Sequence, residues 1–173
     1  MLIYKVPSEP SAKRVALWRR LKGLGAIYLQ SGVCLLPKTV RHVRHVKMIE
    51  NDIAAMGGEA VILETVAFDQ GQREKVLASF TQDRDDQYRE FIGKCEAFEA
   101  EIAKEFAKNK FTYAELEEEE AELKKLQGWL EKIRKLDFYG APLAKEASDW
   151  LRRCEELLDG YAQRVFDEQG GNQ

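Results

Sequence analysis

Two histidines and a cysteine in the first third of the chain are the residues best suited to bind a metal. His42 and His45 would share one side of a helix, and Cys34 precedes them in a short apolar run. Imidazole and thiolate groups are common zinc ligands. The neighbouring side chains, however, are cations that would oppose metal binding. We therefore predict no metal site, and we interpret Cys34 as a core residue.

The same stretch is better described as a basic stripe on a helix. The stripe consists of Arg41, His42, Arg44, His45 and Lys47. Its opposite, buried side is predicted to consist of Val40, Val43 and Val46. The stripe favours contact with an oxyanion or a nucleic-acid backbone over a metal. A solvated face without a ligand is the simpler alternative, and the sequence leaves it open.

An earlier predicted helix carries further basic residues, namely Lys13, Arg19, Arg20 and Lys22. Phosphate binding and a solvated face explain them equally well. No motif for reading bases is evident. The candidate DNA- or anion-binding residues are therefore Lys13, Arg19, Arg20, Lys22, Arg41, His42, Arg44, His45 and Lys47.

Signatures of catalysis are missing from the sequence. It has no nucleophile beside a base, no phosphate loop, no dinucleotide fingerprint and no closely spaced cysteine pair. We therefore predict no catalytic residue, no cofactor and no enzymatic activity.

Positive charge is concentrated at the N-terminal end. Residues 1–58 carry ten Lys/Arg and three Asp/Glu, a balance of +7, whereas residues 59–173 have a balance of −10. This asymmetry predicts an anion-binding surface beside an acidic scaffold or partner surface.

Composition is typical of a globular protein, with 45% hydrophobic and 33% charged residues. No apolar run is long enough to span a membrane, and the N-terminus does not resemble a secretory leader. We therefore expect a cytoplasmic protein. The three cysteines are far apart and odd in number, which indicates buried thiols in a reducing compartment.

Residues 1–68 show alternating strand and helix patterns. Strands are predicted at 2–6, 26–30, 33–36 and 60–68, and helices at 11–24 and 39–56. We expect Ser11 and Thr39 to cap the helices. The first helix is expected to bury Leu17, Trp18, Leu21 and Leu24. The βαββαβ order predicts an α+β fold, a ferredoxin-like sandwich with both helices on one face of the sheet.

Residues 69–168 are predicted to form three amphipathic helices, packed on the first module or on a dimer mate. Their apolar stripes run from Tyr88 to Phe106, from Leu116 to Ile133 and from Ala147 to Val165. Thr112 and Glu115 form a capping box, flanked by a hydrophobic staple of Phe111 and Leu116. Residues 169–173 are expected to be a disordered tail.

Several segments closely resemble the N-terminal part of ChrB-type chromate resistance proteins. They are YKVPSEPS at 4–11, ALWRRLKGLGA at 16–26, LQSGVCLLP at 29–37, GGEA at 57–60, NKFTYAELE at 109–117, WLEKIR at 129–134 and DFYGAP at 137–142. The resemblance implies a chromate-responsive transcriptional regulator that acts beside a membrane chromate efflux pump. Longer members of that family carry a further C-terminal chromate-resistance domain.

A more distant likeness concerns the fold alone. The strand, the basic helix and the hairpin resemble the middle domain of PaaX-like repressors and the small CRISPR adaptation nuclease. Those nucleases place a metal-binding Asp at the end of the first strand. Here that stretch reads Tyr4, Lys5, Val6 and Pro7, so a nuclease of that type is disfavoured.

Three hypotheses follow from these patterns. The first is a dimeric, non-enzymatic regulator that binds DNA, or an oxyanion such as chromate, through its basic module. The second is an enzyme, either a metal-dependent nuclease or a chromate reductase. The third is an interaction subunit whose acidic helices dock a separately encoded chromate-resistance domain.

Overall fold

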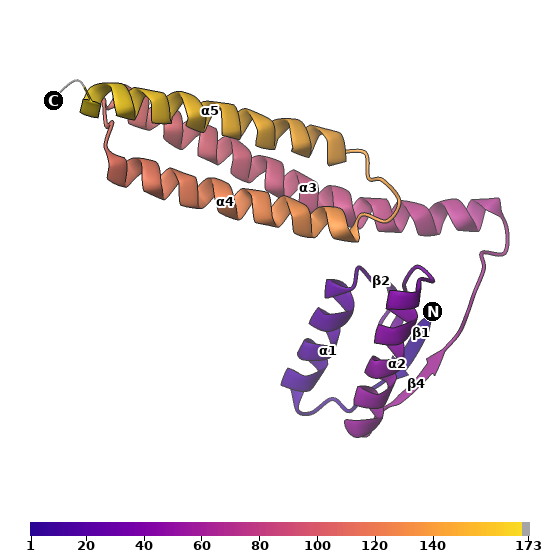
Figure 1. Cartoon of the computed structure of the whole chain (residues 1–173). Coiled ribbons are helices and arrows are strands. Elements are labelled where there is room, and N and C mark those ends of the chain that lie inside the picture. Colours follow the sequence, from indigo (N-terminus) through magenta and orange to yellow (C-terminus); the bar gives the residue numbers. More distant parts are fainter. Residues whose placement is uncertain (171–173) are drawn as a thin grey trace. The chain divides into compact units, whose positions relative to one another are not determined.

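The computed structural model describes residues 1–170 and divides the chain into two compact units (Figure 1). Unit 1 comprises Met1–Phe80 and unit 2 starts at Thr81. The boundary falls inside one long helix.

Unit 1 is a four-stranded antiparallel sheet interleaved with two helices. Its elements are β1 (Leu2–Lys5), α1 (Ser11–Gly23), β2 (Ile27–Gln30), β3 (Val33–Leu35), α2 (Val40–Ala55) and β4 (Glu59–Ile62). The strand order is β2-β3-β1-β4, and every neighbouring pair is antiparallel. The predicted βαββαβ order is therefore confirmed.

The core of unit 1 lies between the helices and the sheet. Leu17, Leu21 and Leu24 from the first helical segment meet the buried side of α2 and the inward residues of the strands. The α2 contribution is Val46, Ile49 and Ile53. The strands contribute Leu2 and Cys34, both nearly inaccessible to solvent. This core fixes the two helices side by side, as Figure 1 shows.

The fourth strand is shorter than predicted. It ends at Ile62, because β1 begins at Leu2 and Met1 is the last residue available as a ladder partner. Met1 and Leu63 close the ladder, with the Leu63 N–H donating to the Met1 carbonyl oxygen at 2.8 Å. Beyond this point Val66 and Phe68 are 92% and 96% exposed. The predicted strand at 60–68 was therefore wrong in its second half.

Two further predictions for the first helix were wrong. Trp18 is 49% exposed because it lies on the flank of α1, about 100° around the helix from the buried Leu17. Ser11 is the first helical residue and not the cap. Pro10 occupies the cap position and has no side chain that can cap, while the Glu9 carboxylate accepts from the Ser11 backbone N–H at 3.2 Å. The Thr39 cap is confirmed, because its hydroxyl accepts from the His42 backbone N–H.

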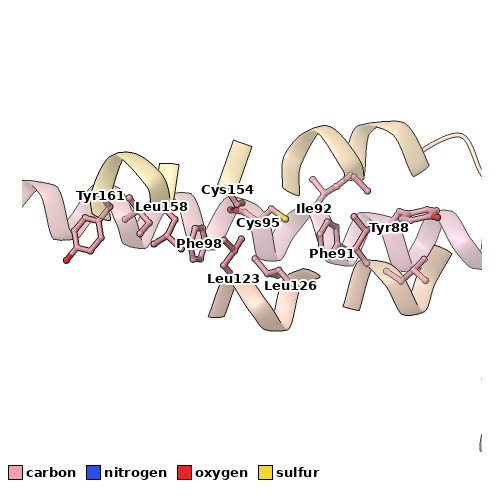
Figure 2. Packing of buried hydrophobic residues seen from close by; sticks show 14 of the residues in the cluster. Tyr88, Phe91, Ile92, Cys95, Phe98, Leu123, Leu126, Cys154, Leu158 and Tyr161 are labelled. Carbon is pink, nitrogen blue, oxygen red and sulfur yellow. Dashed lines mark hydrogen bonds between the residues drawn. The ribbon is translucent and has the colours of Figure 1, made fainter. Parts of the chain in front are cut away.

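Unit 2 is built from three long helices: α3 (Gln70–Ala107), which begins in unit 1, α4 (Tyr113–Leu136) and α5 (Ala144–Gly170). Figure 2 shows their apolar stripes meeting, with Phe91 and Phe98 of α3 beside Leu123 and Leu126 of α4. Tyr161 of α5 completes this core. The predicted stripes are confirmed in outline, but Phe106 is 40% exposed at the end of α3, and Trp150 and Leu157 of α5 are only partly buried against this core.

At the start of α4 the predicted Thr112 cap is confirmed, but the Glu115 carboxylate accepts from the Lys110 ammonium at 2.7 Å, so the reciprocal half of the capping box is not formed. The Thr112 hydroxyl accepts from the Glu115 backbone N–H, and Phe111 and Leu116 are buried in one cluster. At the C-terminus, Gln169 and Gly170 belong to α5, and the Gln169 side chain donates to the Phe111 carbonyl oxygen. The disordered-tail prediction was therefore wrong for these two residues. Its remainder, 171–173, lies outside the described residues.

All three cysteines are buried and free, as predicted. Burial raises the pKa of the Cys34 thiol to about 11. In unit 2 the Cys154 thiol donates to the Cys95 carbonyl oxygen at 3.7 Å (Figure 2). Cys34 is thus a protonated core side chain at neutral pH, which agrees with its sequence-based interpretation.

Candidate nucleic-acid and anion interface

The solvent-facing side of α2 carries three cations in a line. Arg41, Arg44 and Lys47 are all exposed, and their spacing of three residues places them on adjacent turns. The buried side of the helix consists of His42, Val46, Ile49 and Ile53. We call the three exposed cations the α2 stripe. Such a line can contact successive phosphates of a nucleic-acid backbone.

The predicted buried side of α2 was partly wrong. Val40 and Val43 are exposed, while His42 is only 7% exposed. The physical reason is that both His42 ring nitrogens find partners. Nδ1 lies 2.9 Å from the Thr39 hydroxyl, and Nε2–H donates to the Leu24 carbonyl oxygen at 3.1 Å. His42 therefore ties α2 to the end of α1, and it is removed from the candidate interface.

The burial of His42 predicts a pH-dependent stability. Desolvation is the main cause that lowers the pKa of His42, the cation Arg41 adds to it, and the Leu24 hydrogen bond opposes it. Below about pH 6.5 the unfolded chain therefore binds more protons than the folded one. The free energy of unfolding consequently decreases as the pH is lowered. We expect unfolding experiments to show a decrease in the free energy of unfolding as the pH is lowered from about 6.5. The decrease should stop once the pH is below the lowered pKa of His42 in the folded state.

A matched pair of variants isolates this effect. His42→Gln should lower the free energy of unfolding at neutral pH by about 1–3 kcal/mol. It should also flatten the pH dependence below about pH 6.5. His45→Gln should keep the wild-type slope. An unchanged slope in His42→Gln would show that another group is responsible.

His45 stays near the surface but is not a free ligand. It is partly exposed, and its Nδ1–H donates to the Arg41 carbonyl oxygen at 2.7 Å within α2. The two histidines thus face different environments, so they cannot form the metal pair considered from their spacing. Within the described part of the chain, no group of His, Cys, Asp or Glu side chains is arranged to hold a metal ion.

The basic residues of α1 are divided among its sides. Arg20 forms an ion pair with Asp52 of α2, so its charge is offset locally. It shares with Lys13 a groove of about 360 Å³ between the two helices. Arg19 is exposed, whereas Lys22 is half-buried. The candidate residues of α1 therefore differ from one another in exposure and in partners.

Sequence reasoning missed two features of this region. Asp52 is the partner of Arg20, and only the packing of α1 against α2 brings the two together. Arg14 and Trp18 lie on the other flank of α1, where they line a second groove. The helical period could have revealed this flank, because at about 100° per residue Trp18 lies closer around the helix axis to Arg14 than to the buried Leu17.

The charge asymmetry follows the division into units. Residues 1–80 carry twelve Lys/Arg against seven Asp/Glu, and residues 81–173 carry fifteen against twenty-three. Unit 1 is therefore basic and unit 2 acidic. None of the helices within residues 1–170 is long and apolar enough to cross a membrane.

These features define a two-unit α+β protein: a basic sheet-and-helix unit that presents a line of cations, followed by an acidic helical unit. The comparison with family models then identifies the family. Residues 14–172 match the model described as "Protein ChrB, N-terminal", and the chain belongs to this family.

A curated relative supports the assignment. The chain is 26% identical over 163 residues to Protein ChrB of Cupriavidus metallidurans, which covers 92% of this chain and 46% of the relative. The chain thus spans about half the length of that relative. No solved structure matches it significantly.

Proposed function

We propose that this protein is a chromate-responsive regulator that binds DNA through unit 1. The observation that carries the proposal is the exposed α2 stripe of Arg41, Arg44 and Lys47 on a basic unit of a ChrB-family chain. Phosphate contacts supply most of the sequence-independent affinity of DNA-binding proteins. The stripe needs no rearrangement to make such contacts, because the opposite side of α2 is anchored in the core.

The fold supports a role as a binding module. The strand order β2-β3-β1-β4, with both helices packed against the same inward strand residues, is the arrangement expected of a ferredoxin-like sandwich. We therefore assign unit 1 to that class. In the cytoplasm, where we place the protein, such a module can reach chromosomal DNA.

An inorganic oxyanion is the second ligand of the proposal. Chromate is a small dianion, so the cations that contact DNA phosphates could also bind it. Competition between the two at the α2 stripe would release DNA when chromate enters the cell. We further propose that no step of this cycle requires catalysis by the chain.

A second candidate function is an interaction subunit. Unit 2 is acidic, and the relative is about twice as long as the matched region. The acidic helices would then dock a separately encoded chromate-resistance domain. Co-purification of such a domain with this chain, lost when unit 2 is charge-reversed, would favour this candidate.

Transcription in cells tests the regulator proposal. Deleting the gene should change expression from the promoter that it controls, and chromate should no longer alter that expression. Restoring the wild-type gene should restore the response, whereas a gene with Arg41→Glu and Arg44→Glu should not. An unchanged chromate response after deletion would contradict the proposal.

We also propose that the protein is a homodimer. Among the described strands, β4 has only β1 as a sheet neighbour, so its outer edge is unpaired. Val61 on β4 and Leu63 just after it are both about half exposed. Exposed edges with apolar residues favour strand pairing between molecules.

Light scattering at micromolar concentration should give twice the mass of the 19.9 kDa chain. Val61→Lys should weaken the dimer at least about tenfold, because like charges would meet across the paired edges. Val40→Lys is the matched control, since Val40 is an exposed valine on α2 away from the edge. A monomeric wild-type protein at all concentrations would refute the dimer.

A further inference from the structure

A second groove of unit 1 lies on the flank of α1 that faces away from α2. It has a volume of about 520 Å³ and is open to solvent along one side. Arg14 and Trp18 come from α1, Tyr4 from β1, and Ser31 and Gly32 from the turn between β2 and β3. None of these residues belongs to the α2 stripe, so the groove is a separate site.

The base of the groove is held by close backbone contacts. The Tyr4 N–H donates to the Gly32 carbonyl oxygen at 2.7 Å. Gly32 has φ of +73°, and a Cβ at this position would lie 2.4 Å from the Tyr4 carbonyl oxygen. The Tyr4 hydroxyl meets the Tyr28 hydroxyl at 2.9 Å, which fixes the ring. The groove is therefore formed before any ligand arrives.

An aromatic ring is available at this groove. Trp18 is 49% exposed, whereas Leu17 and Leu21 are the buried residues of α1. The indole is therefore not needed to fill the core of unit 1. An exposed indole beside a preformed groove can stack on another flat ring, and stacking on a nucleobase is the common case. Val15, also half-exposed, extends the apolar wall next to it.

A cation accompanies the aromatic ring. The Arg14 guanidinium makes no ion pair among the described residues, and it makes a long hydrogen bond of 3.5 Å to the Ser8 carbonyl oxygen. Lys5 also lines the groove, but it faces Glu59 across the β1–β4 ladder. No Asp or Glu lines the groove within the described part of the chain. Arg14 is therefore the residue best placed for an anionic group.

We infer that this groove binds a nucleotide, with the base stacked on Trp18 and the phosphate paired with Arg14. A tetrahedral inorganic anion would occupy little of a space of about 520 Å³ and would leave the indole without a partner. A nucleotide supplies both the ring and the charge, and a groove of this volume suits a ligand of that size. The nucleotide can be free in solution or an unpaired residue of a DNA strand.

NMR of the indole N–H groups tests this inference in the intact chain. Trp18 is the tryptophan of unit 1, and Trp129 and Trp150 in unit 2 serve as internal controls. Adding deoxyadenosine monophosphate should shift the Trp18 signal and leave the other two in place. Ribose 5-phosphate and inorganic phosphate, which lack the base, should bind at least about fivefold more weakly.

Two variants locate the ligand. Trp18→Ala should weaken nucleotide binding at least about fivefold, whereas Trp18→Phe should retain most of it. Arg14→Gln should weaken the binding of the nucleotide but not of the unphosphorylated nucleoside. The Arg41→Glu, Arg44→Glu double variant should bind the mononucleotide as the wild type does. The proposal that the α2 stripe binds DNA and the inference that the groove binds a nucleotide can therefore be refuted independently.

Short oligonucleotides identify the source of the nucleotide. A single-stranded oligothymidylate that binds the groove more tightly than the mononucleotide indicates a DNA strand, and the reverse indicates a free nucleotide; both support the inference. No shift of the Trp18 signal with any nucleotide would overturn it. Equal binding of phosphate and nucleotide, or binding unaffected by both Arg14→Gln and Trp18→Ala, would overturn it as well.

Discussion

Reversing the charges of Arg41 and Arg44 together is expected to weaken DNA binding by on the order of a hundredfold at physiological salt. Both side chains are exposed on α2, and their replacement by Glu converts two phosphate contacts into two repulsions. The slope of log affinity against log salt should become flatter by about 1.8, since each neutralised phosphate contributes about 0.9. The free energy of unfolding should change by less than about 0.5 kcal/mol, because neither side chain is buried.

A charge-matched control separates a local contact from the net charge of the protein. Lys124→Glu with Lys132→Glu makes the same change on exposed positions of α4 in unit 2. This control should bind DNA nearly as the wild type does. If both double variants lost the same affinity, the effect would come from overall charge. If neither lost affinity, the α2 stripe would be only a solvated face.

Replacing Gly32 by alanine should cost much more stability than the same change at Gly57. Both glycines have positive φ, +73° and +78°, so both substitutions pay a left-handed backbone penalty of about 1–2 kcal/mol. Only at Gly32 does the added Cβ meet a backbone atom, the Tyr4 carbonyl oxygen at 2.4 Å, while at Gly57 it meets nothing within 4 Å. We expect a total loss of about 3 kcal/mol or more at Gly32.

The native indole signal of Trp18 is a suitable probe, because it reports on unit 1 while denaturant is added. The midpoint for Gly32→Ala should fall well below that for Gly57→Ala. Nucleotide binding should fail in Gly32→Ala even where unit 1 remains folded, since the turn would have to move away from Tyr4. Equal midpoints for the two variants would mean that the β2–β3 turn relaxes without cost.

The element order was predictable because local signals agreed with the tertiary fold. Thr39 and Thr112 each precede a helical apolar pattern, and each accepts the expected backbone hydrogen bond. The length of β4 was not predictable, because its end depends on where β1 begins. Residues 65–68 have strand-forming side chains but no ladder partner. The end of β4 was therefore determined by its pairing with β1, which local sequence does not reveal.

The candidate site was predictable only in part. The exposed cations of α2 follow from its helical period, but the orientation of the helix was misjudged. A histidine at the first turn looks polar in the sequence. The Leu24 carbonyl oxygen and the Thr39 hydroxyl make burial of His42 favourable, and the first of these lies on another segment. The Arg20–Asp52 pair likewise depends on helix packing. Contacts between distant segments thus determined which charges remain available.

Fluorescence anisotropy with the DNA upstream of its own gene tests the central proposal most directly. The wild-type protein should bind this duplex with an affinity that falls steeply between about 50 and 200 mM salt, with a slope that corresponds to several phosphates. Chromate should release the DNA, whereas sulfate at the same ionic strength should release less. Absence of binding at the lowest salt, or release by both anions alike, would contradict a chromate-responsive DNA-binding function for unit 1.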